Sequence, residues 1–276
     1  MVSSNRNAYC DFCVSDKMDW NKISKLSKLG YKTIALNKTI DDTAFETKKK
    51  NKKNEAREII DIVPPPTLVP KDNGTQIKIL HRLTVQISEV NSCLKVSQSE
   101  NVKKYDILAV IPTTSAALSH ACTTMDVDII SFSPEARSVL KINRKLYKQA
   151  VERGVFFEIM YAPALKDSTC RKNIIQRAHL YHAIGKSANI IISSGAETEY
   201  QIRGPFDIIN LGLILGMNEQ LCKNSMSENA RKVLLKADNR KRGKAAVFIS
   251  TENKIVKENE DSDFSLPQCK RMKIET

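Results

Sequence analysis

The sequence predicts an α/β fold, an irregular TIM-like barrel of about seven parallel strands with helices around it. Short apolar runs of strand length alternate with segments of helical periodicity along most of the chain. The first three of these elements are a strand, a helix and a strand, and such a unit implies a parallel pair joined by a right-handed crossover. The chain has 276 residues, which is enough for one barrel of roughly 250 residues.

The first unit occupies the beginning of the chain. An apolar run from Ala8 to Val14 predicts a strand, and Gly30 ends the helix that follows it. That helix carries apolar side chains at helical spacing, namely Trp20, Ile23, Leu26 and Leu29. Thr33 to Leu36 is the second strand of the unit.

Residues 47–72 interrupt this pattern. A lysine-rich stretch, KKKNKKNEAR, is followed by PPP, which ends any helix and favours an extended, solvated connection. We therefore predict an exposed insertion. Its lysines are either a phosphate-binding arm or, as is commoner for a run of like charges, a solvated surface. They are Lys48, Lys49, Lys50, Lys52 and Lys53.

Strand and helix alternate through the rest of the predicted barrel. Ile77 to Ile87 alternates apolar and polar side chains, which is the two-residue period of a strand. Shorter apolar runs with the length of buried strands are Ile107–Ile111, Val127–Phe132, Val155–Met160 and Ile190–Ser193. Helical patterns separate them at Ser115–Met125, Asn143–Glu152 and Ser168–Ile184.

A helix that starts with proline and a polar tail end the chain. Pro205 suits the first turn of a helix. The apolar face of this helix consists of Ile208, Leu211 and Leu215. Ala230 to Leu235 predicts a last short helix. We expect residues 1–243 to form a single barrel domain and the polar residues 244–276 to be disordered.

The charge balance fits a polyanionic partner such as nucleic acid and a merely soluble basic protein about equally well. Lysine and arginine total 44 against 31 aspartate and glutamate, and the net charge of +13 attracts phosphate groups. No apolar run reaches the roughly 18 residues of a membrane span, so we expect no membrane partner. The 7 cysteines are scattered and odd in number, which fits reduced thiols in the cytosol or nucleus.

The residue patterns of common catalytic and metal sites are incomplete. Cys10 and Cys13 form a C-x-x-C, but residues three apart on a strand point to opposite faces, so we predict core cysteines. His179 and His182 can share a helix face, without carboxylate or cysteine partners at matching spacing. The sequence contains no Walker loop, G-x-G-x-x-G or G-x-S-x-G. We expect no catalytic residue, no bound metal and no cofactor in this chain.

Polar residues gather where the predicted strands end. They include Thr113, Thr114, the group Asp167 to Lys172 and the group Ser193 to Arg203. In α/β barrels the carboxyl ends of the strands are the usual functional face. Thr113, Ser168 and Thr169 fit helix N-caps, but Arg171 and Lys172 oppose the positive end of the helix dipole. An anion bound there would compensate for these two charges.

Long blocks of the sequence resemble one protein family. The longest are ERGVFFEIMYAPALKDSTCRK at Glu152–Lys172 and ISSGAETEYQIRGPFDIINLGLILGM at Ile192–Met217. Shorter blocks are CDFCV at 10–14, ILHRLTVQIS at 79–88, AVIPTT at 109–114, ACTTMDVDII at 121–130 and ARKVLLKADNRK at 230–241. In this order, over most of Tyr9 to Lys241, they resemble the barrel subunit of eukaryotic ribonuclease P and ribonuclease MRP.

The resemblance implies a PHP-like barrel that helps to fold and position a catalytic RNA. In that family the RNA, with its bound Mg²⁺, removes the 5′ leader of precursor tRNA, and the protein contributes no catalytic residue. The resemblance also implies a small α/β partner subunit, other protein subunits, and MRP RNA as a second RNA partner in rRNA processing. It implies a location in the nucleus and nucleolus.

The chain departs from the related sequences at named positions. PHP enzymes begin with H-x-H on the first strand, where this chain has Asp11-Phe12-Cys13, so those metal ligands are missing. Lys38 and Ile111 stand where the family usually has histidine and glutamine. Neither position is therefore expected to make a contact common to the family.

Our leading hypothesis is RNA binding through a basic surface. The cations assigned to it are Arg82, Arg171, Lys172 and Arg203, with Lys236, Arg240 and Lys241 as peripheral phosphate contacts. For Arg203 the alternative is a structural ion pair with Glu197 or Asp207. Two other functions stay open, a metal-dependent phosphoesterase of the PHP type and a protein scaffold whose RNA contacts are incidental.

Overall fold

Seven parallel strands form one sheet in the sequential order β1 to β7. The computed structural model describes residues 8–42, 61, 63–67, 77–136 and 140–243. The strands are β1 (Tyr9–Ser15), β2 (Tyr31–Asp41), β3 (Lys78–Ile87), β4 (Ile107–Pro112), β5 (Ile129–Ile130), β6 (Phe156–Met160) and β7 (Ile190–Ser193). Each neighbouring pair is parallel. The predicted number and direction of the strands are confirmed.

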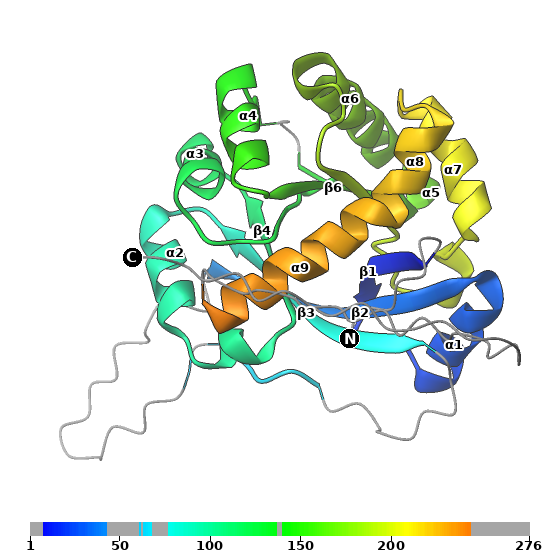
Figure 1. Cartoon of the computed structure of the whole chain (residues 1–276), viewed down its shortest axis with the longest axis horizontal. Helices are drawn as coiled ribbons and strands as arrows, with labels where there is room; N and C mark the ends of the chain where they lie inside the picture. Colours follow the sequence, from blue (N-terminus) through cyan, green and yellow to red (C-terminus); the bar gives the residue numbers. More distant parts are fainter. Residues whose placement is uncertain (1–7, 43–60, 62, 68–76, 137–139, 244–276) are drawn as a thin grey trace, which may run out of the picture. The chain divides into compact units, whose positions relative to one another are not determined.

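The sheet curls until its two edges meet (Figure 1). Val14 of β1 forms a parallel bridge with Ala196, just beyond β7, and the N–H of Ser15 donates to the carbonyl of Ala196 at 2.9 Å. The pairing of β1 with β2 shifts register between Tyr9 and Cys10, and again between Asp11 and Val14. The fold is therefore a nearly closed, irregular α/β barrel, as the sequence predicts.

Helices surround the barrel. They are α1 (Trp20–Lys25), η1 (Leu26–Leu29), α2 (Val90–Gln98), η3 (Asn101–Lys104), α3 (Ser115–Thr123), α4 (Arg144–Glu152), α5 (Ala162–Lys166), α6 (Ser168–Gly185), η4 (Glu199–Gln201), α7 (Pro205–Ile214), α8 (Glu219–Met226) and α9 (Glu228–Arg242). The sequence does not predict α2, α5 or α8, and α9 is much longer than the predicted Ala230–Leu235. Within the described ranges, no helix has the length and apolar character needed to cross a membrane.

One face of each strand points into the barrel, because successive side chains of a strand alternate. Where the strands begin, this interior is apolar. Its strand residues are Cys10, Phe12, Ala35, Leu80, Ile107, Ala109, Ile129, Phe156 and Ile191. Ala230 and Val233 of α9 belong to the same cluster, and α9 contacts β1, β4 and β7. The long helix that crosses the barrel in Figure 1 thus closes this end.

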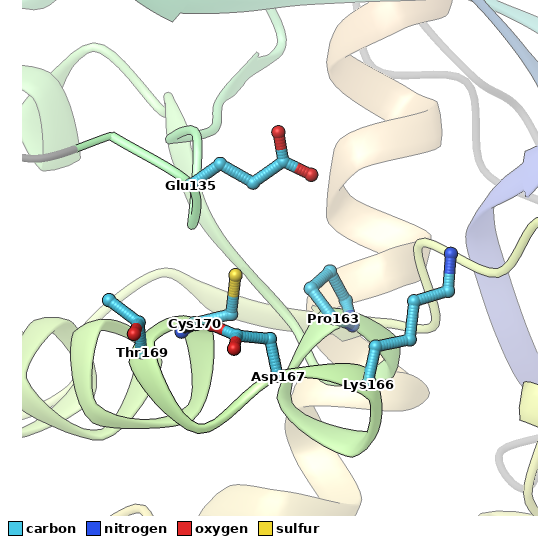
Figure 2. A pocket seen from close by; sticks show the side chains of 6 residues that line it. All are labelled: Glu135, Pro163, Lys166, Asp167, Thr169 and Cys170. Atoms are coloured by element: carbon cyan, nitrogen blue, oxygen red, sulfur yellow. Dashed lines mark hydrogen bonds between the residues drawn. The ribbon is translucent and has the colours of Figure 1, made fainter.

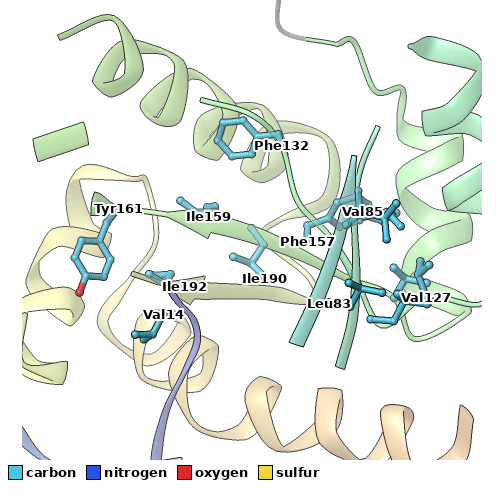
Figure 3. Close-up of a cluster of buried hydrophobic side chains, with 14 of the residues drawn as sticks. Val14, Leu83, Val85, Val127, Phe132, Phe157, Ile159, Tyr161, Ile190 and Ile192 are labelled. Atoms are coloured by element: carbon cyan, nitrogen blue, oxygen red, sulfur yellow. The ribbon is translucent and has the colours of Figure 1, made fainter. Parts of the chain in front are cut away.

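The outer faces of the strands pack against the surrounding helices and form the larger core. Figure 3 shows part of it, with Phe157 and Ile159 of β6 beside Ile190 of β7. Tyr147 of α4 stacks on Phe157 with ring centroids 4.4 Å apart, and Tyr181 of α6 lies 5.0 Å from the same ring. Each such buried aromatic ring stabilises the fold by about 1.5–3 kcal/mol.

Part of the predicted insertion is described and packs against the barrel. Val63 is buried in the larger core. The carboxylate of Asp61 accepts hydrogen bonds from the Ser99 hydroxyl at 2.6 Å and the Asn101 N–H at 2.7 Å. The prediction of an exposed insertion is therefore wrong at these residues. Lys48 to Lys53 and residues 244–276 lie outside the described residues, so the predictions made for them remain predictions.

Candidate functional site

The centre of the barrel holds a buried ion pair. The two terminal guanidinium nitrogens of Arg82 on β3 donate to the two carboxylate oxygens of Glu158 on β6, at 2.5 and 2.6 Å. Both side chains are completely buried. The Nε–H of Arg82 also donates to the Thr84 hydroxyl, and a terminal N–H donates to the Phe12 carbonyl, both at 3.0 Å. Every one of these contacts is inside the barrel.

This position overturns the assignment of Arg82 to an RNA-binding surface. Arg82 and Thr84 alternate with apolar residues as expected for a strand, but their side of the strand faces the barrel interior. Burial opposes ionisation of Glu158, and the adjacent charge of Arg82 outweighs that effect, so the pKa of Glu158 lies below its ordinary value. The pair is therefore charged, and its role is structural.

The three cations of α9 that were assigned to phosphate contacts are also bound within the fold. The Arg240 guanidinium donates to the buried carboxylate of Asp128, the shortest contact being 2.9 Å. Since its side chain is only 9% exposed, the prediction that Arg240 is a peripheral phosphate contact is wrong. Lys241 is exposed but pairs with Asp106 at 2.6 Å, and the ammonium group of Lys236 donates to the carbonyl of Arg153 at 2.8 Å.

Arg171, Lys172 and Arg203 lie at the opposite end, on connections that leave the carboxyl ends of the strands. All three are exposed. Arg171 uses its Nε–H to donate to the carbonyl of Ala164 at 2.9 Å. The guanidinium of Arg203 donates to the carbonyl of Tyr200 at 2.7 Å. None of these three cations takes part in an ion pair with another described residue.

The alternative of a structural ion pair for Arg203 is therefore wrong. Glu197, one of the two proposed partners, binds Lys166 of α5 instead. The backbone around Arg203 is fixed differently, because its N–H donates to the Tyr161 hydroxyl at 3.0 Å and its carbonyl accepts from the Tyr31 hydroxyl at 2.8 Å. The guanidinium group itself is left at the surface.

Three more cations lie at this end of the barrel, and the sequence analysis did not predict them as site residues. Lys141, Arg144 and Lys145 are exposed where α4 begins, after β5. Asn143 caps this helix by accepting from the Leu146 N–H at 2.8 Å, and the first turn contains no acidic residue. The signal in the sequence is the basic cluster KINRK at 141–145, where the predicted helix Asn143–Glu152 begins. At α6 the cap is Asp167, which accepts from the Cys170 N–H at 2.8 Å, and not Ser168 or Thr169.

A cavity of about 340 Å³ lies beside these residues. Figure 2 shows Glu135 above the start of α6, where Asp167, Thr169 and Cys170 lie, with Pro163 and Lys166 of α5 to the right. Cys170 lines the cavity, and burial together with the neighbouring Asp167 raises the pKa of its thiol. A thiol of this kind is a poor nucleophile at neutral pH.

The other predicted thiols and histidines are structural. Cys10 and Cys13 are buried and free, which confirms them as core cysteines, and burial raises the pKa of both thiols to about 12. The Nδ1 of His182 lies 3.1 Å from the Ser187 hydroxyl. In the described part of the chain, no three His, Cys, Asp or Glu side chains are grouped so that they could hold a metal ion.

Comparison with known proteins identifies relatives over nearly the whole barrel. Residues 8–242 match the family described as RNase P subunit p30. Ribonuclease P protein subunit p30 of Mus musculus is 36% identical over 256 residues, which cover 92% of each chain. Ribonuclease P/MRP protein subunit RPP1 of Saccharomyces cerevisiae is 27% identical over 238 residues, covering 83% of this chain and 76% of the yeast protein.

A solved structure shares the fold. A chain in the cryo-EM structure of archaeal ribonuclease P with mature tRNA superimposes with a TM-score of 0.62 at 18% identity. The superposition covers 90% of this chain and 100% of the archaeal one. The barrel described above is therefore an architecture that occurs in a ribonuclease P particle.

Proposed function

Since the chain belongs to the RNase P subunit p30 family, we propose that it is a non-catalytic subunit of ribonuclease P that binds the RNA component through one end of its barrel. That end is the one where the strands terminate. We call it the basic face and define it by Lys141, Arg144, Lys145, Arg171, Lys172 and Arg203. Cleavage of precursor tRNA is assigned to the RNA and its own Mg²⁺, and the protein supports the RNA fold.

The observation that carries this proposal is a group of six exposed cations at one end of the barrel, none of which forms an ion pair with a described carboxylate. At the amino ends of the strands, Arg240 and Lys241 are bound to Asp128 and Asp106. At the carboxyl ends, the basic face has no ion pair to any described carboxylate. Exposed, uncompensated cations on one face are what a phosphate backbone requires, because binding releases the counterions of the RNA.

We extend the proposal to ribonuclease MRP, to precursor tRNA as the substrate of the complex, and to the nucleus and nucleolus as its location. Support for the MRP role comes from the yeast relative, whose name includes both ribonucleases. The same protein surface would serve both particles, because phosphate contacts carry little sequence information. Sequencing of the RNA that copurifies with the native protein tests this, and recovery of neither RNA would contradict it.

The RNA contact is tested by removing charge from the basic face. In a variant that combines Arg144→Ala, Arg171→Ala and Arg203→Ala, the slope of log affinity against log salt should decrease by about two to three, since each lost phosphate contact contributes 0.7 to 0.9. Affinity for the RNA component of ribonuclease P should fall at least about tenfold at low salt. Filter binding over a salt series measures both quantities.

A matched control removes three exposed cations from the other end of the barrel, with Lys103→Ala, Arg231→Ala and Lys232→Ala. This variant has the same net charge as the first. If RNA binding were a general effect of net charge, the two variants would lose equal affinity, and that result would contradict the proposal. Unchanged binding by both variants would favour the scaffold hypothesis, in which RNA contacts are incidental.

We also propose that α7 holds the small α/β partner subunit. Phe206, Leu213 and Ile214 of this helix are 68%, 56% and 60% exposed, and Tyr200 just before it is 78% exposed. The Phe206 ring is held in place by an edge contact with Tyr9, with centroids 5.9 Å apart. A group of large apolar side chains exposed on one short segment is typical of a protein interface.

The partner contact is tested with Phe206→Glu together with Leu213→Glu. Coexpression and pull-down with the small subunit should lose the complex, because two charges would be buried in an apolar interface. Leu94→Glu is the control, since Leu94 is 57% exposed on α2, in another part of the barrel. A complex that survives the α7 variant, or fails with the α2 control as well, would contradict this assignment.

A further inference from the structure

Arg177 of α6 is a buried arginine without a carboxylate partner in the described ranges. The residue is only 5% exposed. Two other arginines with buried side chains, Arg82 and Arg240, are bound to Glu158 and Asp128. The Arg177 guanidinium donates a hydrogen bond to the carbonyl of Leu140 at 2.8 Å, and its Nε has no partner among the described residues.

The guanidinium group lines a cavity of about 250 Å³ at the carboxyl ends of β3 and β4. Gln86 contributes an amide from the end of β3, and Ser133 contributes a hydroxyl from the loop after β5. Thr113 also lines the cavity, but its hydroxyl donates to the carbonyl of Ile87. Phe132 forms an apolar wall, with the Arg177 guanidinium carbon 5.2 Å from the centre of its ring. The cavity therefore combines a cation with several neutral polar groups, the composition of an oxyanion site.

Its surroundings favour a phosphate of RNA as the anion. Glu135 lies at the rim, where it is exposed to solvent, so its charge is screened more than that of buried Arg177. Leu140, which lines the cavity, is followed by Lys141, and Arg144 is at the start of α4. These cations belong to the basic face, so a polyanion bound there would pass the mouth of the cavity.

We propose that this cavity is a phosphate-binding site in which Arg177 binds one backbone phosphate of the RNA component. The inference rests on the proposed function, since it names one buried contact within the RNA-binding face. A guanidinium group binds a phosphate through two parallel N–H donors, which a lysine ammonium group does not reproduce. The bound phosphate would supply the negative charge that Arg177 lacks.

Arg177 also has a structural contribution that the test must separate from binding. Its guanidinium group fixes the Leu140 carbonyl and lies over the rings of Phe132 and Tyr181. Arg153 offers a matched control, because its guanidinium group donates to the carbonyls of Ala121, Cys122 and Met125 and it does not line the cavity. Arg177→Met and Arg153→Met thus both remove an arginine that binds backbone carbonyls.

The first measurement uses inorganic phosphate and the full chain. The melting temperature is compared in phosphate and in chloride at equal ionic strength and pH, so that each variant is its own reference. An anion that binds only the folded protein raises the melting temperature. We expect this difference in the wild type and in Arg153→Met, a smaller one in Arg177→Lys, and none in Arg177→Met. An equal difference in the wild type and both Arg177 variants would overturn the proposal.

The second measurement uses the RNA component. Arg177→Met should lower affinity about ten- to hundredfold and reduce the salt slope by about one, while Arg153→Met should change neither. If Arg177→Met binds RNA like the wild type while the basic-face variant does not, this inference fails and the proposed function stands. If Arg177→Met loses the small protein subunit and keeps RNA, the anion is a protein carboxylate, which also overturns it.

Discussion

Replacing Glu158 with glutamine leaves the positive charge of Arg82 buried in the barrel without its counterion. Both side chains are fully buried, and breaking a buried pair by removing one partner costs about 3–5 kcal/mol. Glutamine retains one oxygen acceptor, so we expect Glu158→Gln to lower the free energy of unfolding by about 3 kcal/mol. That is a large share of the roughly 5–15 kcal/mol that stabilises a typical domain.

The double variant Arg82→Met/Glu158→Leu removes both charges and keeps most of the volume. Replacement of a whole buried pair by apolar side chains is often neutral, and here only Thr84 and the Phe12 carbonyl lose hydrogen bonds from Arg82. We therefore expect the double variant to be more stable than Glu158→Gln. Urea unfolding followed by circular dichroism measures each free energy, and an unchanged denaturant slope shows that the same surface is exposed.

The same pair predicts a pH dependence. The pKa of Glu158 in the folded protein lies below its ordinary value of 4.5, so the unfolded chain takes up a proton first as the pH falls. The contribution of the pair is complete above about pH 4.5 and decreases below it. A Glu158→Gln variant that loses less than about 1 kcal/mol at neutral pH would refute the reasoning, since that is the cost expected at an exposed pair.

The remaining predictions concern other contacts of the fold. Gly185→Ala would place a Cβ 2.0 Å from the Tyr147 ring, which packs against Phe157 and Tyr181 and cannot easily move. The free energy of unfolding should therefore fall by about 1–3 kcal/mol or more, which thermal melting measures. An unchanged melting temperature would contradict this packing. Arg240→Ala should lower the free energy of unfolding in urea by about 3–5 kcal/mol, because it leaves the charge of Asp128 buried and unpaired. Lys241→Ala should lower it by less than about 1 kcal/mol. Equal losses in the two variants would be inconsistent with the burial of Asp128. Burial raises the pKa of Asp11 above its ordinary 3.8, although Ser194 and Cys13 donate to it. Since the unfolded chain then ionises first as the pH rises, Asp11→Asn should gain stability relative to the wild type as the pH rises above about 4. A difference that does not change as the pH rises from there would argue against it.

The order of elements could be predicted because strand and helix have different periods. Ile77 to Ile87 shows the two-residue period and forms β3, and Pro205 begins α7 as its preference for the first helical turn predicts. The extents were harder to predict. Val127 to Phe132 contains a single two-residue strand, β5, because the chain pairs with β4 at only Ile129 and Ile130. The apolar content of a segment does not show how many of its residues pair with a neighbouring strand.

The last helix shows a different limit. KADNRKR looks like the start of a charged tail, yet it continues α9 to Arg242. The reason lies far away in the sequence, because Asp106 and Asp128 bind Lys241 and Arg240. Each carboxylate lies one residue before a strand, β4 or β5, and no local sequence pattern pairs it with a cation more than a hundred residues later. Such pairs can be identified only from the folded structure of the barrel.

The two-residue period of β3 was predicted correctly, but the assignment of Arg82 to an RNA-binding surface was wrong. Alternation identifies the two faces of a strand, and on an open sheet the polar face is the solvated one. In a closed barrel both faces are buried, so a polar stripe indicates an interior network as readily as a surface. The inner positions of β3 and β6 provide Arg82 and Glu158, which neutralise each other. Arg171 and Arg203 are on connections after strands, where alternation has no bearing, and these two are exposed.

The location of a cation relative to the strand direction is therefore more informative than the net charge of +13. At the amino ends, Arg240 and Lys241 are bound by carboxylates of the same fold and contribute to closing the barrel. The six cations of the basic face have no such partner among the described residues, and maintaining them close together costs electrostatic free energy in the isolated protein. Binding of a polyanion removes that repulsion. It follows that lowering the salt concentration should destabilise the free protein and stabilise its complex with RNA, a pair of opposite responses that a protein with evenly distributed charge would not show.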